Sequence, residues 1–189
     1  MLVKNGKRLF WKDGTKIMAE YEQVVHPFPP FYRADSEVLI LGSLPSVKSR
    51  EQGFYYGHPR NRFWRMLLRI FGEEGTLESI EEKKRFLAKH RLALYDVIYS
   101  CEIRGSSDSS IRKVIPADIR EIMQGSRVSR ILLNGKTSAG LFRKYQSRVY
   151  QDIMWELPST SPANAAMSLD ALVERWQQAV TQRTGGDPF

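Results

Sequence analysis

Short apolar runs separated by amphipathic stretches constrain the fold of this chain most strongly. Val38–Leu41 is a continuous apolar run that ends at Gly42, and the pattern recurs at Leu92–Tyr95, Ile131–Leu133 and Ile153–Trp155. Runs of this length without polar alternation are typical of strands that are buried on both faces of a parallel sheet. The sequence therefore predicts four buried parallel strands.

Helical patterns lie between these strands. In Asn61–Phe71 the apolar side chains share one face and the arginines share another, as in a helix that packs on a sheet. Further helices are predicted at Glu78–His90, Ala117–Gln124 (with Pro116 in the first turn), Ser138–Tyr145 and Ser168–Thr181. The alternation predicts an α/β fold: a three-layer α/β/α domain around a central four-stranded, mainly parallel sheet. Crossovers in such folds are right-handed, and ligands bind beyond the carboxyl ends of the strands.

The N-terminal residues form a separate unit in this prediction. Lys7–Tyr21 has the pattern of a β-hairpin with its turn at Lys12–Gly14, and the proline-rich stretch His26–Phe31 is expected to run extended. We expect a hairpin extension over residues 1–25, an α/β domain over residues 26–181 and a flexible tail over residues 182–189.

Composition narrows the class of protein. The chain has 189 residues, the size of one ordinary domain. No apolar run approaches the roughly 20 residues that a membrane-spanning helix needs, and Met1–Lys7 has no signal-peptide core. We therefore expect a cytoplasmic protein that acts as a monomer and has no membrane partner.

Metal and disulfide chemistry are not indicated. Cys101 is the only cysteine, which excludes an intramolecular disulfide and a multi-thiolate zinc site. His26, His58 and His90 lie too far apart for the common helical metal-ligand spacings. The sequence predicts neither a metal nor a cofactor.

Positive charge points to a polyanionic partner. The chain has 29 Lys and Arg against 21 Asp and Glu, a net charge of +8. The charge is local, because a cluster of arginines falls within a stretch that also contains Phe63 and Trp64, whereas acidic residues gather at Glu73–Glu82. The clustered arginines are Arg60, Arg62, Arg65 and Arg69.

One segment resembles a nucleotide-binding P-loop but does not match the complete motif. Gly135–Ser138 has the end of a phosphate-binding P-loop, but Arg130 stands where the motif requires its first glycine. A strand–turn–helix junction, in which Asn134 helps to make the turn and Thr137 or Ser138 caps the helix, explains these residues.

The remaining residues that suggest a ligand-binding site lie in the segment after the first apolar run. Gly42 can let the backbone approach a ligand, and the adjacent aromatics Phe54–Tyr56 offer ring faces that could stack a base. Taken singly, the aromatics are more often packing residues, Asn61 is a helix cap, and the arginines form a solvated helix face. Their combination in one loop indicates a pocket.

These residues resemble the uracil-DNA glycosylase superfamily. Gly42–Ser46 and the sequence His58–Trp64 (His-Pro-Arg-Asn-Arg-Phe-Trp) are similar to the mismatch-specific branch, whose motifs read Gly-Ile-Asn-Pro-Gly and His-Pro-x-Asn-Arg-Phe-Trp. In that branch the asparagine of the first motif positions the hydrolytic water, but Leu44 occupies that position here. The usual catalytic residue is therefore absent.

This departure, together with Ser43 and the Tyr55–Tyr56 pair, resembles the hypoxanthine-DNA (deoxyinosine) glycosylase family of the same superfamily. There the later asparagine is catalytic, and its match here is Asn61. The superfamily's second motif, a Pro/Ser-rich loop that presses on DNA, resembles Leu157–Ala165. The resemblance covers roughly residues 27–181 and implies a monofunctional enzyme of base excision repair, because no lysine for a Schiff base lies in either motif.

The resemblance and the charge together assign roles to individual residues. Asn61 would orient a water toward C1′ of an extruded nucleotide, and Tyr56 would lie against its base. The other substrate-binding residues would be Gly42, Ser43, Leu44 and His58. The residues expected to bind DNA are Arg60, Arg62, Arg65, Ser159, Thr160, Ser161 and Asn164, with Asn164 as the wedge.

The expected partner is double-stranded DNA containing a deaminated base, and single-stranded DNA is a second candidate. Three alternatives remain open from the sequence. The first is a preference for uracil, xanthine or a mispaired base on the same scaffold. The second is a non-catalytic protein that binds damaged or single-stranded DNA, which Leu44 at the usual catalytic position favours. The third is a small-molecule hydrolase of similar layout, which leaves the arginine cluster without a role.

Overall fold

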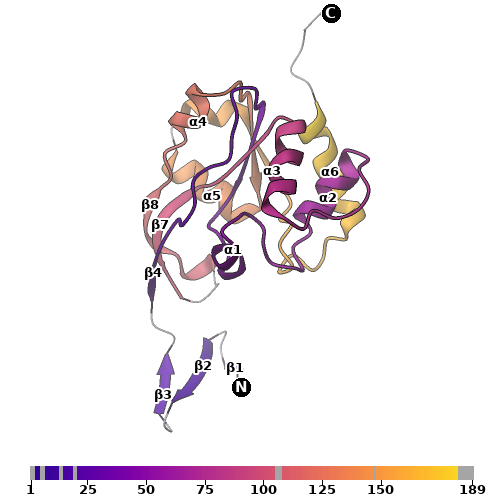
Figure 1. The fold of residues 1–189 in the computed structure, drawn as a ribbon. Coiled ribbons are helices and arrows are strands. Elements are labelled where there is room, and N and C mark those ends of the chain that lie inside the picture. Colours follow the sequence, from indigo (N-terminus) through magenta and orange to yellow (C-terminus); the bar gives the residue numbers. More distant parts are fainter. Residues whose placement is uncertain are drawn as a thin grey trace, which may run out of the picture.

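The computed structural model of the chain describes residues 3–4, 7–12, 15–18, 21–104, 108–146 and 148–182. Figure 1 shows their arrangement. The strands are β1 (Val3–Lys4), β2 (Lys7–Lys12), β3 (Thr15–Met18), β4 (Glu22–Val25), β5 (Val38–Gly42), β6 (Leu92–Asp96), β7 (Ile98–Ile103), β8 (Arg112–Pro116), β9 (Arg130–Asn134) and β10 (Met154–Leu157). The helices are α1 (Val47–Gln52), α2 (Phe63–Ile70), α3 (Ile80–Lys89), α4 (Arg120–Gln124), α5 (Lys136–Tyr145) and α6 (Leu169–Thr181), with 3₁₀ turns at Asp108–Ser110 and Arg148–Ile153.

The central sheet contains β10, β9, β5 and β6 in that order, and each neighbouring pair is parallel. In its middle Leu39 lies between Ile131 on one side and Ala93 on the other. All three side chains are buried, which is why these strands form continuous apolar runs in the sequence. The predicted four-stranded parallel sheet is confirmed.

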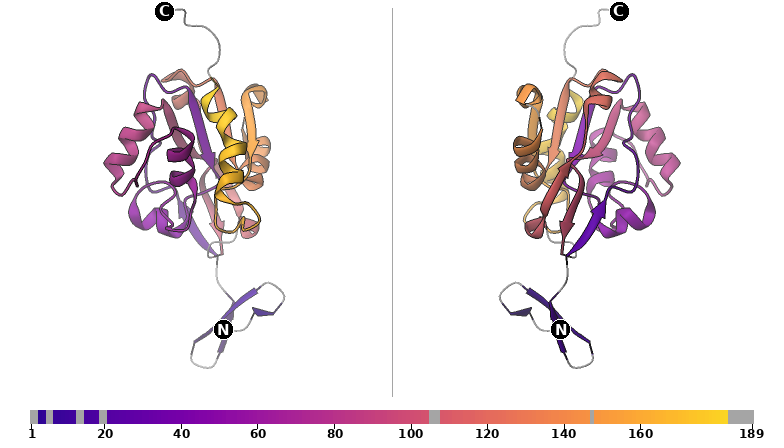
Figure 2. Two further views of the ribbon diagram at one scale, coloured as in Figure 1. Left: turned by 90° about the vertical axis from the view of Figure 1, so that its right-hand side faces the viewer. Right: turned by 90° about the vertical axis from the view of Figure 1, so that its left-hand side faces the viewer.

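Helices cover both faces of this sheet. Figure 2 shows α2 and α3 on one side of the strands and α5 on the other. α6 packs against α2 and the edge strand β10, and its Trp176 is fully buried. The three-layer arrangement that the sequence predicts is therefore confirmed. None of the described helices is long and apolar enough to cross a membrane.

Two helices differ from the prediction. α1 was not predicted, and it begins after Ser46, whose hydroxyl accepts a hydrogen bond from the Ser49 amide. The helix predicted at Ala117–Gln124 begins only at Arg120, and Pro116 ends β8 instead of opening the helix. Propensity favoured helix from Pro116 onward, but strand pairing of that residue with Ile98 determines where the helix can start.

A second, antiparallel sheet was also missed. It contains β4, β7 and β8 in that order, and β7 follows β6 after the single residue Val97. Val24 lies opposite Cys101, and both belong to a small cluster of buried side chains beneath this sheet. The strands are short and largely exposed on one face, so the sequence lacks the apolar runs that identified the central sheet.

The N-terminal strands form their own antiparallel sheet of β1, β2 and β3. Lys12 pairs with Thr15, so β2 and β3 make the predicted hairpin, and Lys12 belongs to β2 and not to the turn. The pairing of β1 with β2 adds a third strand to it. The predicted turn residues 13 and 14, and residues 183–189 of the predicted tail, lie outside the described residues.

Candidate active site

A cleft of about 770 Å³ lies at the carboxyl ends of the central strands. Its walls include the last residues of β5, β6 and β9, which are Gly42, Asp96 and Asn134, and the loop that follows β10. This is the position that the predicted topology favours for a ligand. Both sequence motifs meet there.

Most of the residues singled out in the sequence line this cleft, and three do not. Those that line it are Gly42, Ser43, Leu44, Tyr56, His58, Arg60, Asn61, Ser159, Thr160 and Ser161. Arg62, Arg65 and Asn164 are not among the residues of its wall.

Asn61 lines the cleft, and its side-chain amide is held in a fixed orientation. Its Oδ1 accepts a hydrogen bond from the Phe63 amide at 3.0 Å, and its own backbone N–H donates to the His58 carbonyl at 2.8 Å. Because an amide N–H only donates, this contact identifies which side-chain atom is the oxygen. The carbonyl oxygen retains a second lone pair, which can accept a hydrogen bond from a water.

His58 shapes the turn before Asn61. Its Nδ1 accepts a hydrogen bond from the Arg60 amide at 3.1 Å. A ring nitrogen that accepts carries no proton, so this hydrogen bond leaves Nε2 as the donor of the ring. His58 can therefore donate one hydrogen bond from Nε2 on the cleft wall.

Tyr56 has a more crowded position than the sequence indicated. Its ring stacks on Phe63 with centroids 3.7 Å apart, so one of its faces is covered by the protein and not available to a base. Its φ of 53° lies in the left-handed region, which is uncommon for a residue other than glycine. Burial, followed by the charge of Asp96, raises the pKa of its hydroxyl well above the ordinary value.

Asp96 and His26 form a buried pair beside the cleft that the sequence analysis did not identify. Asp96 Oδ2 lies 2.9 Å from His26 Nε2, and their side chains are 6% and 0% exposed. The other ring nitrogen, His26 Nδ1, lies 2.8 Å from the Phe28 carbonyl oxygen. Asp96 is the only carboxylate among the described residues of the cleft wall.

Gly42 makes room for this carboxyl group. A Cβ on Gly42 would lie 2.3 Å from Asp96 Oδ1 and 3.5 Å from the Tyr56 hydroxyl. We expected Gly42 to let the backbone approach a ligand, whereas in the structure the space beside it is occupied by the Asp96 side chain of the neighbouring strand. Oδ1 therefore lies against the end of β5, on the side away from His26.

The loop after β10 is held to the sheet by Asn134. The side chain of Asn134 accepts from the Thr160 amide and donates to the Thr160 hydroxyl, both at 2.9 Å. Gly135, with φ of +101°, allows close approach, since a Cβ there would lie 2.8 Å from Ser159 Cβ. Thr160 is fully buried, so it does not bind DNA phosphate as expected but anchors the loop.

Arg62 holds the same loop from the side of α2. Its guanidinium donates to the carbonyl oxygens of Ser161 at 2.6 Å and Asn164 at 3.0 Å, and to that of Met167. Its Nε and its backbone N–H both donate to the Thr160 carbonyl. The prediction that Arg62 binds phosphate is therefore corrected, because its donors are engaged by the loop backbone.

Asn164 also turns inward. Its Nδ2 donates to the Ser159 carbonyl at 2.9 Å, which closes the loop on itself and leaves this side chain unsuited to the wedge role expected from the sequence. Ser159 Oγ and Ser161 Oγ accept hydrogen bonds from loop amides. Their hydroxyl protons remain as donors.

The other arginines of the cluster point outward. Arg60 and Arg65 are exposed, and Arg60 lies on the cleft wall. Arg69 is exposed as well and pairs with Asp170 of α6 at 2.5 Å. Of the clustered arginines, Arg60 and Arg65 therefore remain as outward-facing positive charges, and Lys136 adds an exposed charge on the cleft wall.

Asp96, Asn134 and His26 were not predicted as site residues, because the sequence marks them only weakly or not at all. Asp96 and Asn134 each follow a buried apolar run, so both are polar residues at the carboxyl end of a predicted strand, and that position could have identified them. His26 gives no such signal, because its partner lies 70 residues away. Among the described residues, no group of three or more His, Cys, Asp or Glu could hold a metal ion.

Comparison with known proteins places this geometry in a family. The sequence model of the uracil DNA glycosylase superfamily matches residues 29–180. A protein named hypoxanthine DNA glycosylase from Methanosarcina barkeri is 34% identical over 161 residues, which cover 80% of this chain and 95% of the relative. A protein of the same name from Methanosarcina acetivorans is 33% identical and covers 75% of this chain and 89% of the relative.

A solved structure agrees with this assignment. The solution NMR structure of a candidate uracil DNA glycosylase from Methanosarcina acetivorans has a TM-score of 0.66 and 31% identity, over 81% of this chain and 94% of that one. The matched residues include the whole central sheet and the loops that form the cleft. The chain belongs to the uracil DNA glycosylase superfamily and is a DNA glycosylase, a hydrolase of N-glycosyl bonds.

Proposed function

We propose that this DNA glycosylase removes hypoxanthine from DNA in which deoxyadenosine has been deaminated to deoxyinosine, and that Asn61 positions the attacking water. The observation that carries the proposal is the Asn61 amide, fixed by the Phe63 N–H on the wall of a cleft that both motifs enclose. The names of the Methanosarcina relatives support hypoxanthine as the base.

The proposed reaction begins with extrusion of the nucleotide. Unstacking a base costs a few kcal/mol, and the cost is least for a damaged or mispaired base. Arg60 and Arg65 attract the phosphate backbone without reading its sequence. The hydroxyl groups of Ser159 and Ser161 donate to phosphates beside the extruded nucleotide, from a loop whose backbone is already fixed by Asn134 and Arg62.

Hydrolysis then needs a positioned water and a stabilised leaving group. Cleavage develops positive charge on the sugar and negative charge on the departing purine. The second lone pair of Asn61 Oδ1 accepts from the water and directs it toward C1′, although a neutral amide is not a strong general base. His58 Nε2–H and the backbone N–H groups of Ser43 and Leu44 are the donors we assign to the base.

We propose that the enzyme is monofunctional, that is, that it hydrolyses the N-glycosyl bond without a Schiff-base lyase step. The sequence motifs contain no lysine, but Lys48 and Lys136 line the cleft. Lys48 pairs with Glu51 at 2.7 Å, so its ammonium group is already engaged by a carboxylate. We expect no covalent adduct when the reaction is treated with borohydride, and a trapped DNA–protein species would contradict a purely hydrolytic mechanism.

The experiment that tests the function is incubation of the protein with end-labelled duplexes that each contain one deoxyinosine, deoxyuridine or deoxyxanthosine. Alkali then converts abasic sites into strand breaks. We expect breaks at deoxyinosine above the other two, in the presence of EDTA. Faster excision of uracil or xanthine would replace the proposed substrate, and stoichiometric binding without breaks would replace catalysis by a binding function.

A further inference from the structure

One proton lies between His26 and Asp96, and the contacts of the His26 ring determine where it can be held. The Phe28 carbonyl can only accept, so His26 Nδ1 must donate to it at 2.8 Å and therefore always carries a proton. The second ring nitrogen, Nε2, faces Asp96 Oδ2 at 2.9 Å. Either Nε2 is protonated and donates to a carboxylate, or Asp96 is protonated on Oδ2 and donates to Nε2.

The two forms have the same consequence for the other carboxyl oxygen. In the first form Asp96 is a carboxylate, and Oδ1 is an acceptor. In the second form the proton is held on Oδ2 by His26, and Oδ1 is the carbonyl oxygen, which again only accepts. Because Asp96 and His26 are both almost fully buried, water does not offer the proton another partner on that side.

Asp96 lines the cleft, and its Oδ1 lies on the side of Gly42, which also lines it. Oδ1 is close enough to Gly42 that a Cβ at that residue would overlap it. The titratable groups packed around the pair are Tyr55, Tyr56 and Tyr95, and their pKa values are all raised, first by burial and then by the charge of Asp96. These phenols stay neutral near pH 7 and do not take the proton from the pair.

A permanent acceptor distinguishes hypoxanthine and uracil from the adenine and cytosine from which they derive. Adenine and cytosine have a bare ring nitrogen on their pairing edge, next to the exocyclic amine. Deamination replaces the amine with a carbonyl and puts a hydrogen on that nitrogen, so hypoxanthine and uracil present an N–H where adenine and cytosine present a lone pair. Guanine, thymine and xanthine carry such an N–H as well. An acceptor therefore favours hypoxanthine over adenine and uracil over cytosine, and other contacts of the cleft must exclude guanine and thymine.

We propose that His26 is a positioning residue that keeps Asp96 Oδ1 a permanent hydrogen-bond acceptor, and that this acceptor selects bases with a ring N–H on the pairing edge. The inference rests on the proposed function, since it specifies how the same cleft chooses its base. Asp96 is the contact to the base, and His26 acts through Asp96.

The test compares two duplexes, one with deoxyinosine and one with deoxynebularine, whose purine base has a bare N1. Single-turnover excision rates are measured for wild type and variants, and each variant is judged by its ratio of the two rates. Intrinsic differences between the two leaving groups cancel when ratios are compared between variants. Melting temperatures are recorded for every variant.

Three variants test the roles of the two residues. Asp96→Ala removes the acceptor, and the preference for hypoxanthine falls by roughly one to two orders of magnitude. Asp96→Asn preserves the preference within about threefold, because its Nδ2 donates to neutral His26 Nε2 and its Oδ1 stays an acceptor. His26→Phe retains the ring in contact with Phe28 but frees the Asp96 proton to move to Oδ1, so the preference falls as in Asp96→Ala.

Other outcomes overturn the proposal. If Asp96→Asn and Asp96→Ala both slow the two substrates equally, Asp96 acts through its charge and not as the acceptor that reads the base. If His26→Phe lowers the melting temperature but leaves the ratio unchanged, His26 is only structural. If wild type excises neither base, the proposed function fails, and the same ratio taken from the dissociation constants of the two duplexes still tests the acceptor.

Discussion

At the scale of single residues, Asn61 combines two tasks in one amide. Its Oδ1 accepts from the Phe63 N–H at the start of α2, as a helix-capping side chain does, and the residue lines the cleft. The capping contact contributes about 1 kcal/mol to the free energy of unfolding. It also holds the oxygen still, which is what a group that orients a water requires.

These tasks can be separated by substitution. We expect Asn61→Ala to lose both, with a lower melting temperature and a single-turnover excision rate reduced at least 100-fold, or roughly 3 kcal/mol of transition-state stabilisation. Asn61→Ser is the matched control, because a serine hydroxyl also caps the helix but is too short to reach the water. A serine variant with normal melting temperature and a near-normal rate would contradict the catalytic assignment.

Gly42 is constrained by the side chain beside it. We expect Gly42→Ala to destabilise the protein by about 1–3 kcal/mol, because the new Cβ would lie 2.3 Å from Asp96 Oδ1 and must displace it. Excision of deoxyinosine should fall at least tenfold as the carboxyl group moves. Denaturant unfolding and single-turnover rates measure the two effects.

Gly140 in α5 provides the control for this substitution. Nothing lies within 4 Å of a Cβ built there. Gly140→Ala should therefore stabilise the protein by up to about 1 kcal/mol through helix propensity, without changing excision. If Gly42→Ala and Gly140→Ala had the same free energy of unfolding and the same excision rate, the space next to Gly42 would not be critical.

At the scale of elements, the loop after β10 is positioned from two sides. Asn134 binds it to the end of β9, and Arg62 binds it to the start of α2 through several backbone carbonyls. The resemblance in the sequence located this loop correctly on the cleft. Arg62 and Asn164 do not have the DNA-binding roles first predicted for them, because both side chains donate hydrogen bonds to backbone carbonyls of this loop.

Loss of the Arg62 side-chain contacts should leave partly buried carbonyls without these donors. We expect Arg62→Ala to destabilise the protein by about 2–3 kcal/mol and to slow excision on duplex DNA. Arg62→Lys should recover only part of this loss, because one ammonium group cannot reach carbonyls spread over residues 160–167. A lysine variant with the stability and rate of wild type would show that charge alone is needed at this position.

The elements differ in how far the sequence could predict them. β5 and β9 lie in the middle of the sheet, and burial on both faces leaves a clear pattern of apolar residues. β4 and β8 lie at the edges of a small sheet with one face exposed, so their pattern is weak. Asn61 was found because its neighbours form a local motif, whereas the contact between His26 and Asp96 depends on strands far apart in the sequence and has no local pattern.

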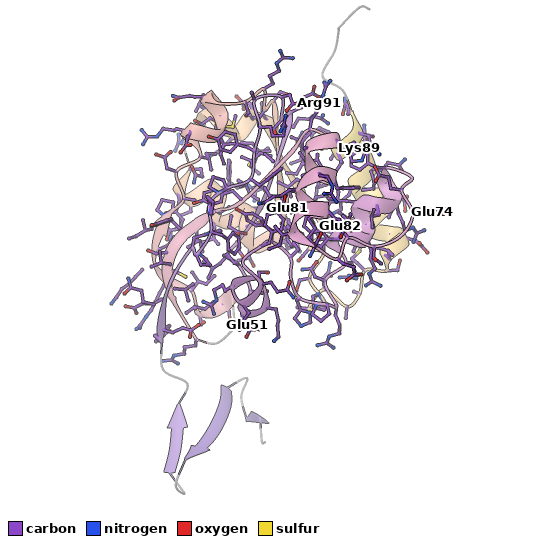
Figure 3. All side chains as sticks on the ribbon, viewed as in Figure 1. Glu51, Glu74, Glu81, Glu82, Lys89 and Arg91 are labelled. Atoms are coloured by element: carbon purple, nitrogen blue, oxygen red, sulfur yellow. The ribbon has the colours of Figure 1, made fainter. Side chains whose placement is uncertain are left out.

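At the scale of the whole molecule, charge is distributed unevenly around the sheet. The net charge is +8, and Arg60 and Arg65 are exposed near the carboxyl ends of the strands. Acidic residues gather elsewhere, and Figure 3 shows Glu74, Glu81 and Glu82 around α2 and α3. Several of the other arginines are neutralised by carboxylates, as Arg69 is by Asp170. DNA affinity should therefore depend on a few arginines and not on the total charge.

Salt dependence of binding distinguishes these arginines. Each phosphate contact that is lost should reduce the slope of log K against log salt concentration by about 1. We expect this change for Arg60→Ala and for Arg65→Ala, with similar losses of affinity for duplexes of different sequence. Arg62→Ala should leave the slope unchanged, because its guanidinium binds the protein's own carbonyls.

Arg33 is a suitable control for general charge. It is exposed, pairs weakly with Asp35 at 3.4 Å, and precedes β5, so it lies toward the amino ends of the strands, away from the cleft. Arg33→Ala removes the same charge as Arg60→Ala and should leave the slope unaltered. If all four variants shifted the slope equally, long-range attraction by net charge would explain DNA binding, and the surface beside the cleft would have no special part in it.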